Sequence, residues 1–285
     1  MPLIQEPTAI DIHVHPADEA NIAFMGKFHE YAEKYFRRKM PPVSLDETAD
    51  NYRSLNTIAV LLALDCESHF GTPAVSNDHV AAAVKKHPDI FLGFGSVDPW
   101  KGKRAVEAVE RVRDLGLIGM KFHASEQAFY MNDHRFYPLW EKCAELELPC
   151  IFHMGMCGIG AGAPGGLGMK LKYSQPIPYL DDVAADFPEL TIIGAHPAWP
   201  WQEEMLAVAM HKSNVYMDLS GWSPKYFPPS LIRYANYALG DKVLFGSDYP
   251  VLTAERWLKD FEQAGFKEEL HRKILYENAR KLLKL

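Results

Sequence analysis

The 285-residue sequence is poor in cysteine and has no long apolar run. Its four cysteines are Cys66, Cys143, Cys150 and Cys157. They form no C-x-x-C pair and do not indicate a disulfide scaffold, so we expect free thiols. No apolar run approaches the roughly 18 residues that a membrane-spanning helix needs. The first residues also lack the basic start and apolar stretch of a signal peptide. We therefore expect a cytoplasmic protein without a membrane partner.

An excess of positive charge is also absent, since the formal net charge is -7. A nucleic-acid partner is disfavoured because no basic stripe is available to displace counterions from phosphates. No G-x-G-x-x-G follows the first predicted strand, which disfavours an open dinucleotide-binding sheet. What the chain does have is 48% apolar and 24% charged residues, the mixture of a globular protein with a full core.

One pattern recurs along the chain: a short β-branched or aromatic run, a turn, and then a helix-like stretch. Apolar residues at helical spacing predict helices within 76–87, 103–116 and 134–146. The predicted strands are 9–15, 57–64, 90–97, 117–123, 150–155, 191–196, 214–220 and 242–248. Eight strands that alternate with helices predict an α/β fold, a single TIM-type (β/α)8 barrel over residues 1–285.

Two connections are longer than a barrel requires. Residues 17–54 separate the first two strands, and residues 155–176 form a glycine-rich loop after the fifth strand. Long loops in compact domains tend to be functional or disordered. Both follow carboxyl ends of strands, where the active sites of barrels lie, so we interpret them as active-site insertions.

Titratable side chains gather at the predicted strand ends. In "AIDIHVHP" the alternation of a strand places His13 and His15 on one side. The other strand ends contribute Lys121, His123, His153, His196 and Asp248. A single buried histidine is more often a satisfied core residue than a ligand. So many polar groups on one rim need a shared partner, and imidazoles with a carboxylate suit a divalent transition metal better than calcium or magnesium.

The ordered motifs "DIHVH", "GMKFH", "FHMG", "GAHP" and "GSDYP" resemble those of the amidohydrolase superfamily, in its amidohydrolase-related family 2 branch. The resemblance covers nearly the whole chain. It implies that His13, His15, His153 and Asp248 hold one divalent ion, commonly zinc, with manganese, iron, cobalt and nickel as alternatives. It further implies that His196 acts beside the metal as a base or polarising group, and that Asp248 doubles as ligand and proton shuttle.

Lys121 has two interpretations. Binuclear members of the superfamily carry a carboxylated lysine on strand four that bridges two metals, and "GMKFH" places Lys121 near that position. A second ion is expected only if Lys121 is carboxylated. Otherwise Lys121 is the cation at a strand end that grips a carboxylate, phenolate or thioester oxygen, which gives it a catalytic and a substrate-binding role.

Aromatic residues follow several strands and predict a flat apolar slot for a planar substrate, although any one of them could simply pack a helix on the barrel. The residues expected to contact substrate are Lys121, His123, Trp199, Trp222 and Tyr249. The glycine-rich loop is followed by Lys170 and Lys172, so it is either a phosphate-binding segment or a flexible lid. Segments 164–188 and 214–226 are similar to 4-hydroxyphenyl-β-ketoacyl-CoA hydrolases, which would make a CoA thioester the substrate.

A metal centre of this kind lowers the pKa of bound water and polarises carbonyls. Our main hypothesis is a metal-dependent hydrolase acting on a carbonyl of a small aromatic substrate. The alternative is a nonoxidative decarboxylase of a hydroxylated aromatic or muconate-type acid, as the family branch also implies, and a more distant one is a catalytically silent ligand-binding barrel. The expected partner is a small molecule, and the sequence leaves homo-oligomer formation open.

Overall fold

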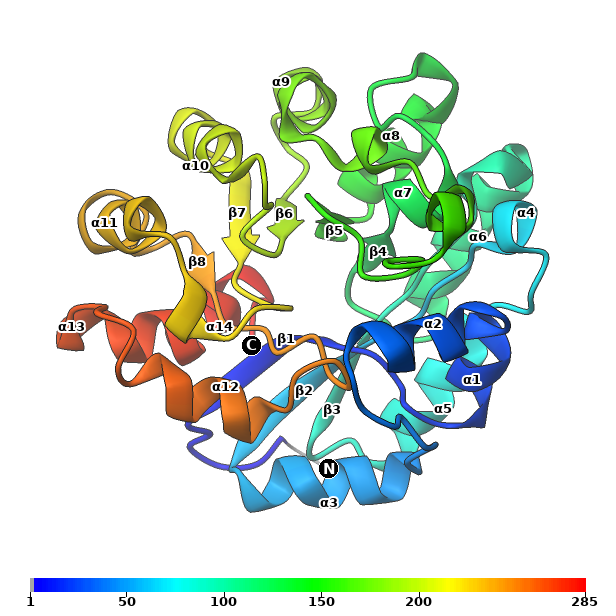
Figure 1. Cartoon of the computed structure of the whole chain (residues 1–285). Coiled ribbons are helices and arrows are strands. Elements are labelled where there is room, and N and C mark those ends of the chain that lie inside the picture. Colours follow the sequence, from blue (N-terminus) through cyan, green and yellow to red (C-terminus); the bar gives the residue numbers. More distant parts are fainter. Residues whose placement is uncertain (1–2) are drawn as a thin grey trace.

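The computed structural model describes residues 3–285 and alternates strands with helices along the chain (Figure 1). The strands are β1 (Ala9–Val14), β2 (Thr57–Leu62), β3 (Phe91–Phe94), β4 (Met120–Phe122), β5 (Cys150–His153), β6 (Ile192–Ala195), β7 (Val215–Asp218) and β8 (Val243–Leu244). All eight lie within the predicted segments and are shorter than expected. Several polar residues predicted at strand ends therefore sit in the first residues after a strand.

The helices occupy the connections between the strands. They are α1 (Glu19–Met25), α2 (Phe28–Tyr35), α3 (Leu45–Ser54), α4 (Glu67–Phe70), α5 (Asn77–Lys86), α6 (Lys103–Asp114), α7 (Ala124–Gln127), α8 (Tyr137–Glu145), α9 (Asp181–Asp186), α10 (Gln202–His211), α11 (Pro229–Tyr237), α12 (Ala254–Phe261), α13 (Glu268–Arg272) and α14 (Asn278–Leu282). Helix α5 begins where the Ser76 side chain accepts a hydrogen bond from the His79 backbone N–H at 3.2 Å. Helix α6 buries Ala105, Val109 and Val112, which share one face.

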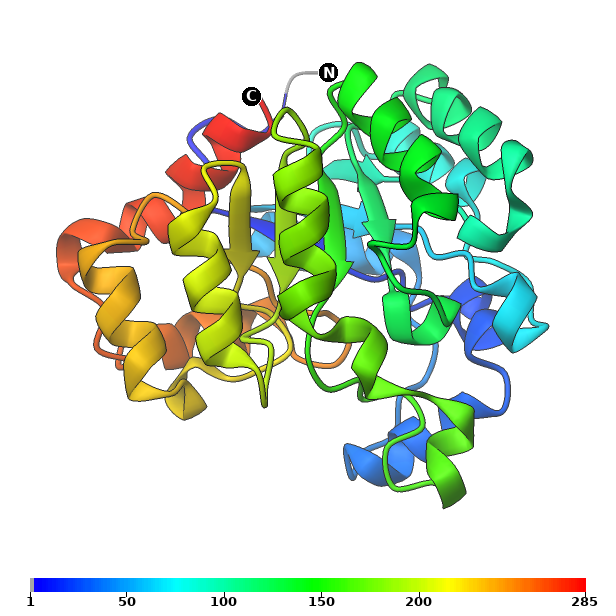
Figure 2. The same ribbon diagram turned by 90° about the horizontal axis from the view of Figure 1, so that it is seen from above.

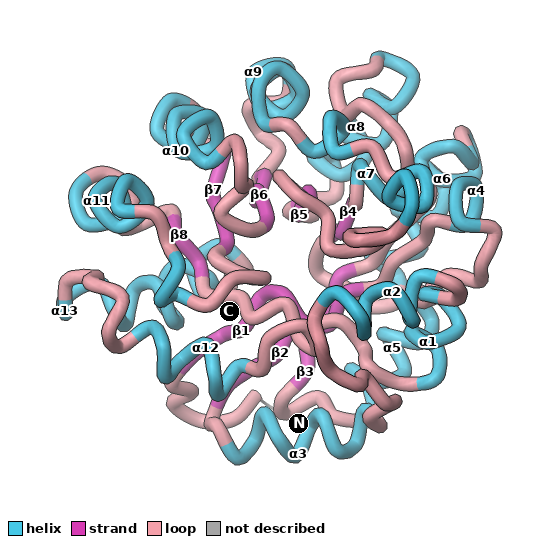
Figure 3. The backbone as a smooth tube through the Cα atoms, viewed as in Figure 1, coloured by secondary structure: helices cyan, strands magenta, loops and turns pink. Residues whose placement is uncertain are grey.

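The strands form a closed parallel ring. Two sheets, in the orders β1-β2-β3 and β4-β5-β6-β7-β8, consist of parallel pairs. Parallel bridges between Gly95 and Met120 and between Val14 and Tyr249 join the two sheets at both seams. Figure 3 shows the strands as the inner ring and the helices around it. The predicted TIM-type barrel is therefore confirmed.

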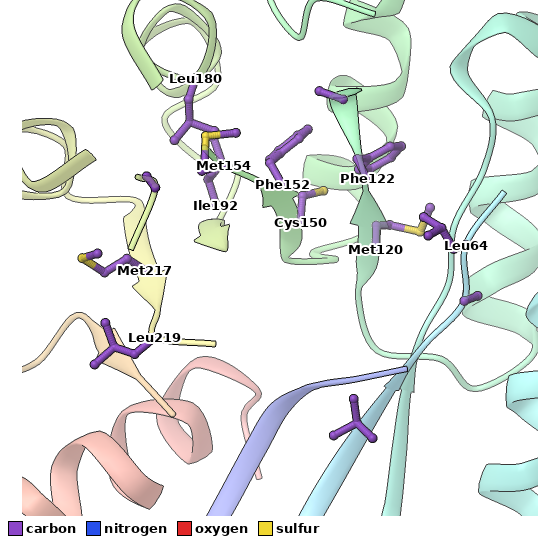
Figure 4. Close-up of a cluster of buried hydrophobic side chains, with 14 of the residues drawn as sticks. Leu64, Met120, Phe122, Cys150, Phe152, Met154, Leu180, Ile192, Met217 and Leu219 are labelled. Carbon is purple, nitrogen blue, oxygen red and sulfur yellow. The ribbon is translucent and has the colours of Figure 1, made fainter. Parts of the chain in front are cut away.

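Strand alternation divides the buried side chains between two cores. Ile12 and Ile151 belong to the cluster inside the barrel. Phe122 and Phe152 face the surrounding helices (Figure 4), and Phe122 packs edge-on against Trp140 of α8 with ring centroids 4.9 Å apart. Burying one such side chain contributes roughly 1.5–3 kcal/mol, so both sides of every strand stabilise the ring on which the polar groups are mounted.

The two insertions lie at one end of the barrel. Figure 2 shows the strands pointing toward the end where α1, α2 and the loop 155–176 project, while the C-terminus lies at the opposite end. The four cysteines are buried and free, as expected. Among residues 3–285, no helix combines the length and apolarity of a membrane span.

Candidate metal centre and active-site pocket

Polar side chains from four strands meet at the carboxyl end of the barrel. Asp248 Oδ1 lies 3.5 Å from His13 Nε2 and 3.5 Å from His15 Nε2. His196 Nε2 lies 3.0 Å from His153 Nδ1, and the His196 ring centroid is 4.9 Å from that of His13. The structure thus brings the five residues of the expected centre together.

The donor atoms suit a single cation. His13, His196 and Asp248 each offer a ligand atom within 4.8 Å of the others. Two ligands bonded to one ion at about 2.0–2.2 Å lie roughly 3.0–3.5 Å apart at octahedral or tetrahedral angles. The two contacts of Asp248 Oδ1 match that separation. Which of the five side chains bind the ion stays a prediction.

Asp218 at the end of β7 orients His13. Its Oδ2 accepts a hydrogen bond from His13 Nδ1 at 2.9 Å, so the lone pair of Nε2 faces the centre. Burial lowers the pKa of His13 to about 3, which keeps the imidazole in its neutral, ligand-forming state. Asp218 Oδ1 also accepts from the backbone N–H of His196 at 3.1 Å. Sequence reasoning missed Asp218, although it lies within the seventh predicted strand, 214–220, and ends the observed β7.

Lys121 lies inside this centre. Its side chain is fully buried, and Nζ donates a hydrogen bond to His13 Nε2 at 2.9 Å. Burial lowers the pKa of Lys121 because the ammonium form is poorly solvated there. The amine therefore sits against a nitrogen expected to bind metal. This position agrees with the predicted strand-four site, and carboxylation of Lys121 stays an alternative interpretation.

Two residues of the centre have left-handed backbone conformations. The φ angles of His196 and Asp248 are 69° and 67°, in a region that non-glycine residues rarely adopt. The Asp248 N–H is held by the carbonyl of His13 at 2.9 Å, across the seam between β1 and β8. Burial raises the pKa of Asp248, but hydrogen bonding to His15 and the nearby imidazoles lower it to about 2, so the carboxylate is ionised.

Gly221 leaves the space that this arrangement needs. It has a φ of +76°, and a Cβ atom there would lie 2.8 Å from His196 Nδ1 and 3.2 Å from Asp248 Oδ2. Any larger residue would displace one of these side chains. The glycine is therefore required both by its backbone conformation and by close approach.

A second polar cluster adjoins the centre. His123 Nδ1 accepts from the backbone N–H of Glu126 at 3.3 Å, so Nε2 carries the hydrogen and faces Glu126 Oε1 at 3.2 Å. Cys157 also lies here, with Sγ 3.8 Å from His123 Nε2. His123, His153 and Cys157 could form a metal-binding group by distance alone. However, the His123 and His153 rings stack at 3.7 Å with planes 15° apart, so their in-plane lone pairs run side by side instead of converging on one ion.

A pocket opens beside the centre. Its apolar wall comes largely from the first insertion and from the glycine-rich loop. The apolar and aromatic residues that line it include Phe24, Met25, Tyr35, Phe36, Met40, Met156, Ile159 and Trp222. Trp222 therefore lies where the sequence suggested. Trp199 is 49% exposed, and neither Trp199 nor Tyr249 lines this pocket among the described residues.

The family model described as amidohydrolase matches residues 10–285. Decarboxylase orsB of Emericella nidulans is 25% identical over 278 residues, which cover 79% of this chain and 82% of that protein. The γ-resorcylate decarboxylase of a Polaromonas species is 24% identical over 272 residues, which cover 81% of this chain and 82% of that protein.

Solved structures share the barrel. An uncharacterized TIM-barrel protein from Bordetella bronchiseptica is 26% identical, with a TM-score of 0.81 over 97% of this chain and 98% of that one. A dihydroxybenzoic acid decarboxylase from Polaromonas, which contains manganese and the inhibitor 2-nitroresorcinol, is 20% identical, with a TM-score of 0.66 over 98% of this chain and 97% of that one.

Proposed function

Since the chain belongs to the amidohydrolase family, we propose that it is a divalent-metal-dependent decarboxylase that removes carbon dioxide from a hydroxylated aromatic acid without oxidation. The observation that carries the proposal is the convergence of His13 Nε2 and His15 Nε2 on Asp248 Oδ1 beside an apolar pocket. Imidazole and carboxylate donors suit a divalent transition metal.

Decarboxylation replaces hydrolysis as the first hypothesis. The metal donors are compatible with either reaction, and the sequence interpretation ranked hydrolysis first. The two relatives named above are decarboxylases, and their alignments cover about four-fifths of the chain. Nothing in the described pocket supports a CoA substrate. Lys172, which a phosphate-binding loop would turn toward the CoA phosphates, instead lies over the rings of Tyr130 and Tyr173, with Nζ 5.3 and 5.6 Å from their centroids.

We assign the metal to His13, His15, His153 and Asp248. When bound, a divalent ion supplies positive charge that holds the carboxylate and phenolate oxygens of the substrate. The solved relative from Polaromonas contains manganese, so manganese is the ion to test first in this protein, with zinc second. Lys121 Nζ is a hydrogen-bond donor available to a further substrate oxygen.

Side chains of the protein transfer one proton during the reaction. In decarboxylation the C–C bond breaks, carbon dioxide leaves, and the electron pair left on the ring carbon takes up a proton. We assign Asp248 to relay that proton: its ionised carboxylate takes a proton from solvent, passes it to the ring carbon and is ionised again afterwards. His196 stands beside it, held through its backbone N–H by Asp218 and through Nδ1 by Ser220 Oγ at 2.8 Å. The apolar wall excludes water from the substrate ring.

An isotope experiment tests the proposal. Manganese- and zinc-loaded protein is supplied with γ-resorcylate, 5-carboxyvanillate and other hydroxybenzoates in D₂O and, separately, in ¹⁸O-labelled water. We expect release of carbon dioxide, with one deuterium on the carbon that lost it and no ¹⁸O in the organic product. Incorporation of ¹⁸O into a product carboxylate would establish hydrolysis instead. Failure of the metal-loaded protein to decarboxylate any of these acids would contradict the proposal.

A further inference from the structure

One carboxyl group of the pocket wall has no part in the chemistry above. Glu126 lies in α7 and lines the pocket, although only 2% of its surface is exposed. Its Oε1 lies 3.2 Å from His123 Nε2, and the His123 ring stacks in turn on that of His153, an expected metal ligand. Among the described pocket residues, the only other carboxylate is Asp248. Glu126 is therefore a polar group placed away from the atoms that hold the metal.

The hydrogen-bonding capacity of Glu126 is only partly used. A carboxylate has about four lone-pair positions. Within the described residues, its oxygens meet His123 Nε2 at 3.2 Å and two thiols, Cys66 Sγ at 3.7 Å and Cys157 Sγ at 3.9 Å. Thiols are weak donors, and these contacts are long. Burying a carboxyl costs free energy of solvation, and these few long hydrogen bonds offset little of that cost. A hydrogen-bond donor on a ligand would therefore stabilise the group.

We propose that Glu126 is a specificity-determining residue that accepts a hydrogen bond from a ring hydroxyl of the substrate, remote from the group bound at the metal centre. The assignment rests on the proposed function, because it takes the ligand to be an aromatic acid. It narrows the substrate class to aromatic acids that carry a second ring hydroxyl beyond the one beside the carboxylate.

The pocket around Glu126 favours an uncharged hydrogen-bond donor on the substrate. The wall of the pocket is largely apolar, with Phe24, Met25 and Ile159 among its residues. An ammonium substituent would lose more hydration there than a hydroxyl would. A second carboxylate would face a group that is itself acidic. A hydroxyl can pair with the Glu126 carboxyl in either protonation state, because one carboxyl oxygen always accepts.

The test measures binding and requires no turnover. Manganese-loaded protein is titrated calorimetrically with 2-nitrophenol and with its ring-hydroxylated analogues, including 2-nitroresorcinol. We expect the wild type to bind at least one hydroxylated analogue about tenfold to a hundredfold more tightly than 2-nitrophenol, the range for one hydrogen bond to a charged or strongly polar group. Glu126→Leu should erase that preference while changing the affinity for 2-nitrophenol less than about threefold.

Two further variants separate recognition from structure. Glu126→Gln retains one acceptor oxygen, so the preference should shrink without vanishing, and this variant serves if the leucine protein does not fold. Cys66→Ala removes a thiol beside the same carboxyl without altering a pocket-lining residue, so the preference should persist.

Three results would overturn the assignment. They are a wild type with no preference among the analogues, a preference that survives in both Glu126 variants, and an equal loss of affinity for all ligands in those variants, which would indicate a structural role. The proposed function fails separately: if hydroxylated analogues bind as expected but no aromatic acid is decarboxylated, the recognition site stands and the activity does not.

Discussion

Asp218→Asn removes the charge that orients one expected metal ligand while keeping the shape of the side chain. In the wild type the Asp218 carboxylate accepts from His13 Nδ1 at 2.9 Å and from the backbone N–H groups of His196 and Ser220 at 3.1 and 2.9 Å. An asparagine can present only one acceptor oxygen. If its NH₂ faces His13, the imidazole proton moves to Nε2, and the lone pair that faces Asp248 is lost.

The expected loss follows from this change of tautomer. Removing a partner that orients a metal-bound histidine typically costs about 10- to 100-fold in metal affinity, or about 1.4–2.7 kcal/mol. The measurement is a competition titration of manganese and zinc against a chromophoric chelator. Decarboxylase turnover is followed at saturating metal, where part of the activity should return.

The matched control is Asp241→Asn. Asp241 is 77% exposed and pairs with Lys273 at 2.7 Å, away from the centre, so its replacement should leave metal affinity unchanged. An Asp218→Asn protein that folds and binds both metals within about twofold of the wild type would refute the role assigned to Asp218.

Three further outcomes are expected. Gly221→Ala should lower kcat by about tenfold or more and lower the melting temperature, because its Cβ would meet His196 Nδ1 at 2.8 Å. The control is Gly116→Ala, where φ is +77° and no atom lies within 4 Å, so only the melting temperature should fall. Equal kcat values for the two variants would contradict this reasoning. His196→Asn should retain its metal by elemental analysis and lose about 10²-fold in kcat, whereas loss of the metal would make His196 a ligand. Burial raises the pKa of Glu126 from 4.5 to about 8, so its contribution to stability is complete below pH 4.5 and is lost as the pH rises through 8. In metal-free protein, the melting temperature of Glu126→Gln relative to wild type should therefore rise between pH 5 and 8.5, and a constant difference would refute the shift.

The barrel could be predicted because its signals are local. Each strand is a short β-branched or aromatic run, and the helices between strands carry apolar residues at helical spacing. The same rule located the polar residues of the centre, since parallel strands in a barrel bring their carboxyl ends to one rim. His13 and Asp248 are more than 200 residues apart, yet His13, His153, His196 and Asp248 all lie near the carboxyl end of a strand or shortly after it.

The contacts that tune the site could not be predicted from local signals. Asp218 orients His13 from 205 positions away, and nothing in its own segment specifies that partner. Glu126 reaches the pocket through a short turn of helix after β4. The apolar wall comes from the insertion between β1 and β2, whose position over the barrel depends on tertiary packing. Tryptophans near strand ends were the natural guess, but Trp199 is half exposed at the surface.

The apolar wall of the pocket, more than the metal donors, decides why decarboxylation is ranked above hydrolysis. Hydrolysis needs a water molecule at the centre and space for it to attack, and the donor set alone permits this. Loss of carbon dioxide needs no attacking water, and apolar surroundings next to the metal-held carboxylate exclude water and favour the uncharged product. Phe24, Phe36, Met40 and Ile159 supply such surroundings beside His13 and Asp248. The apolar wall and the decarboxylase relatives therefore point the same way, although the motifs at the strand ends could not distinguish the two reactions.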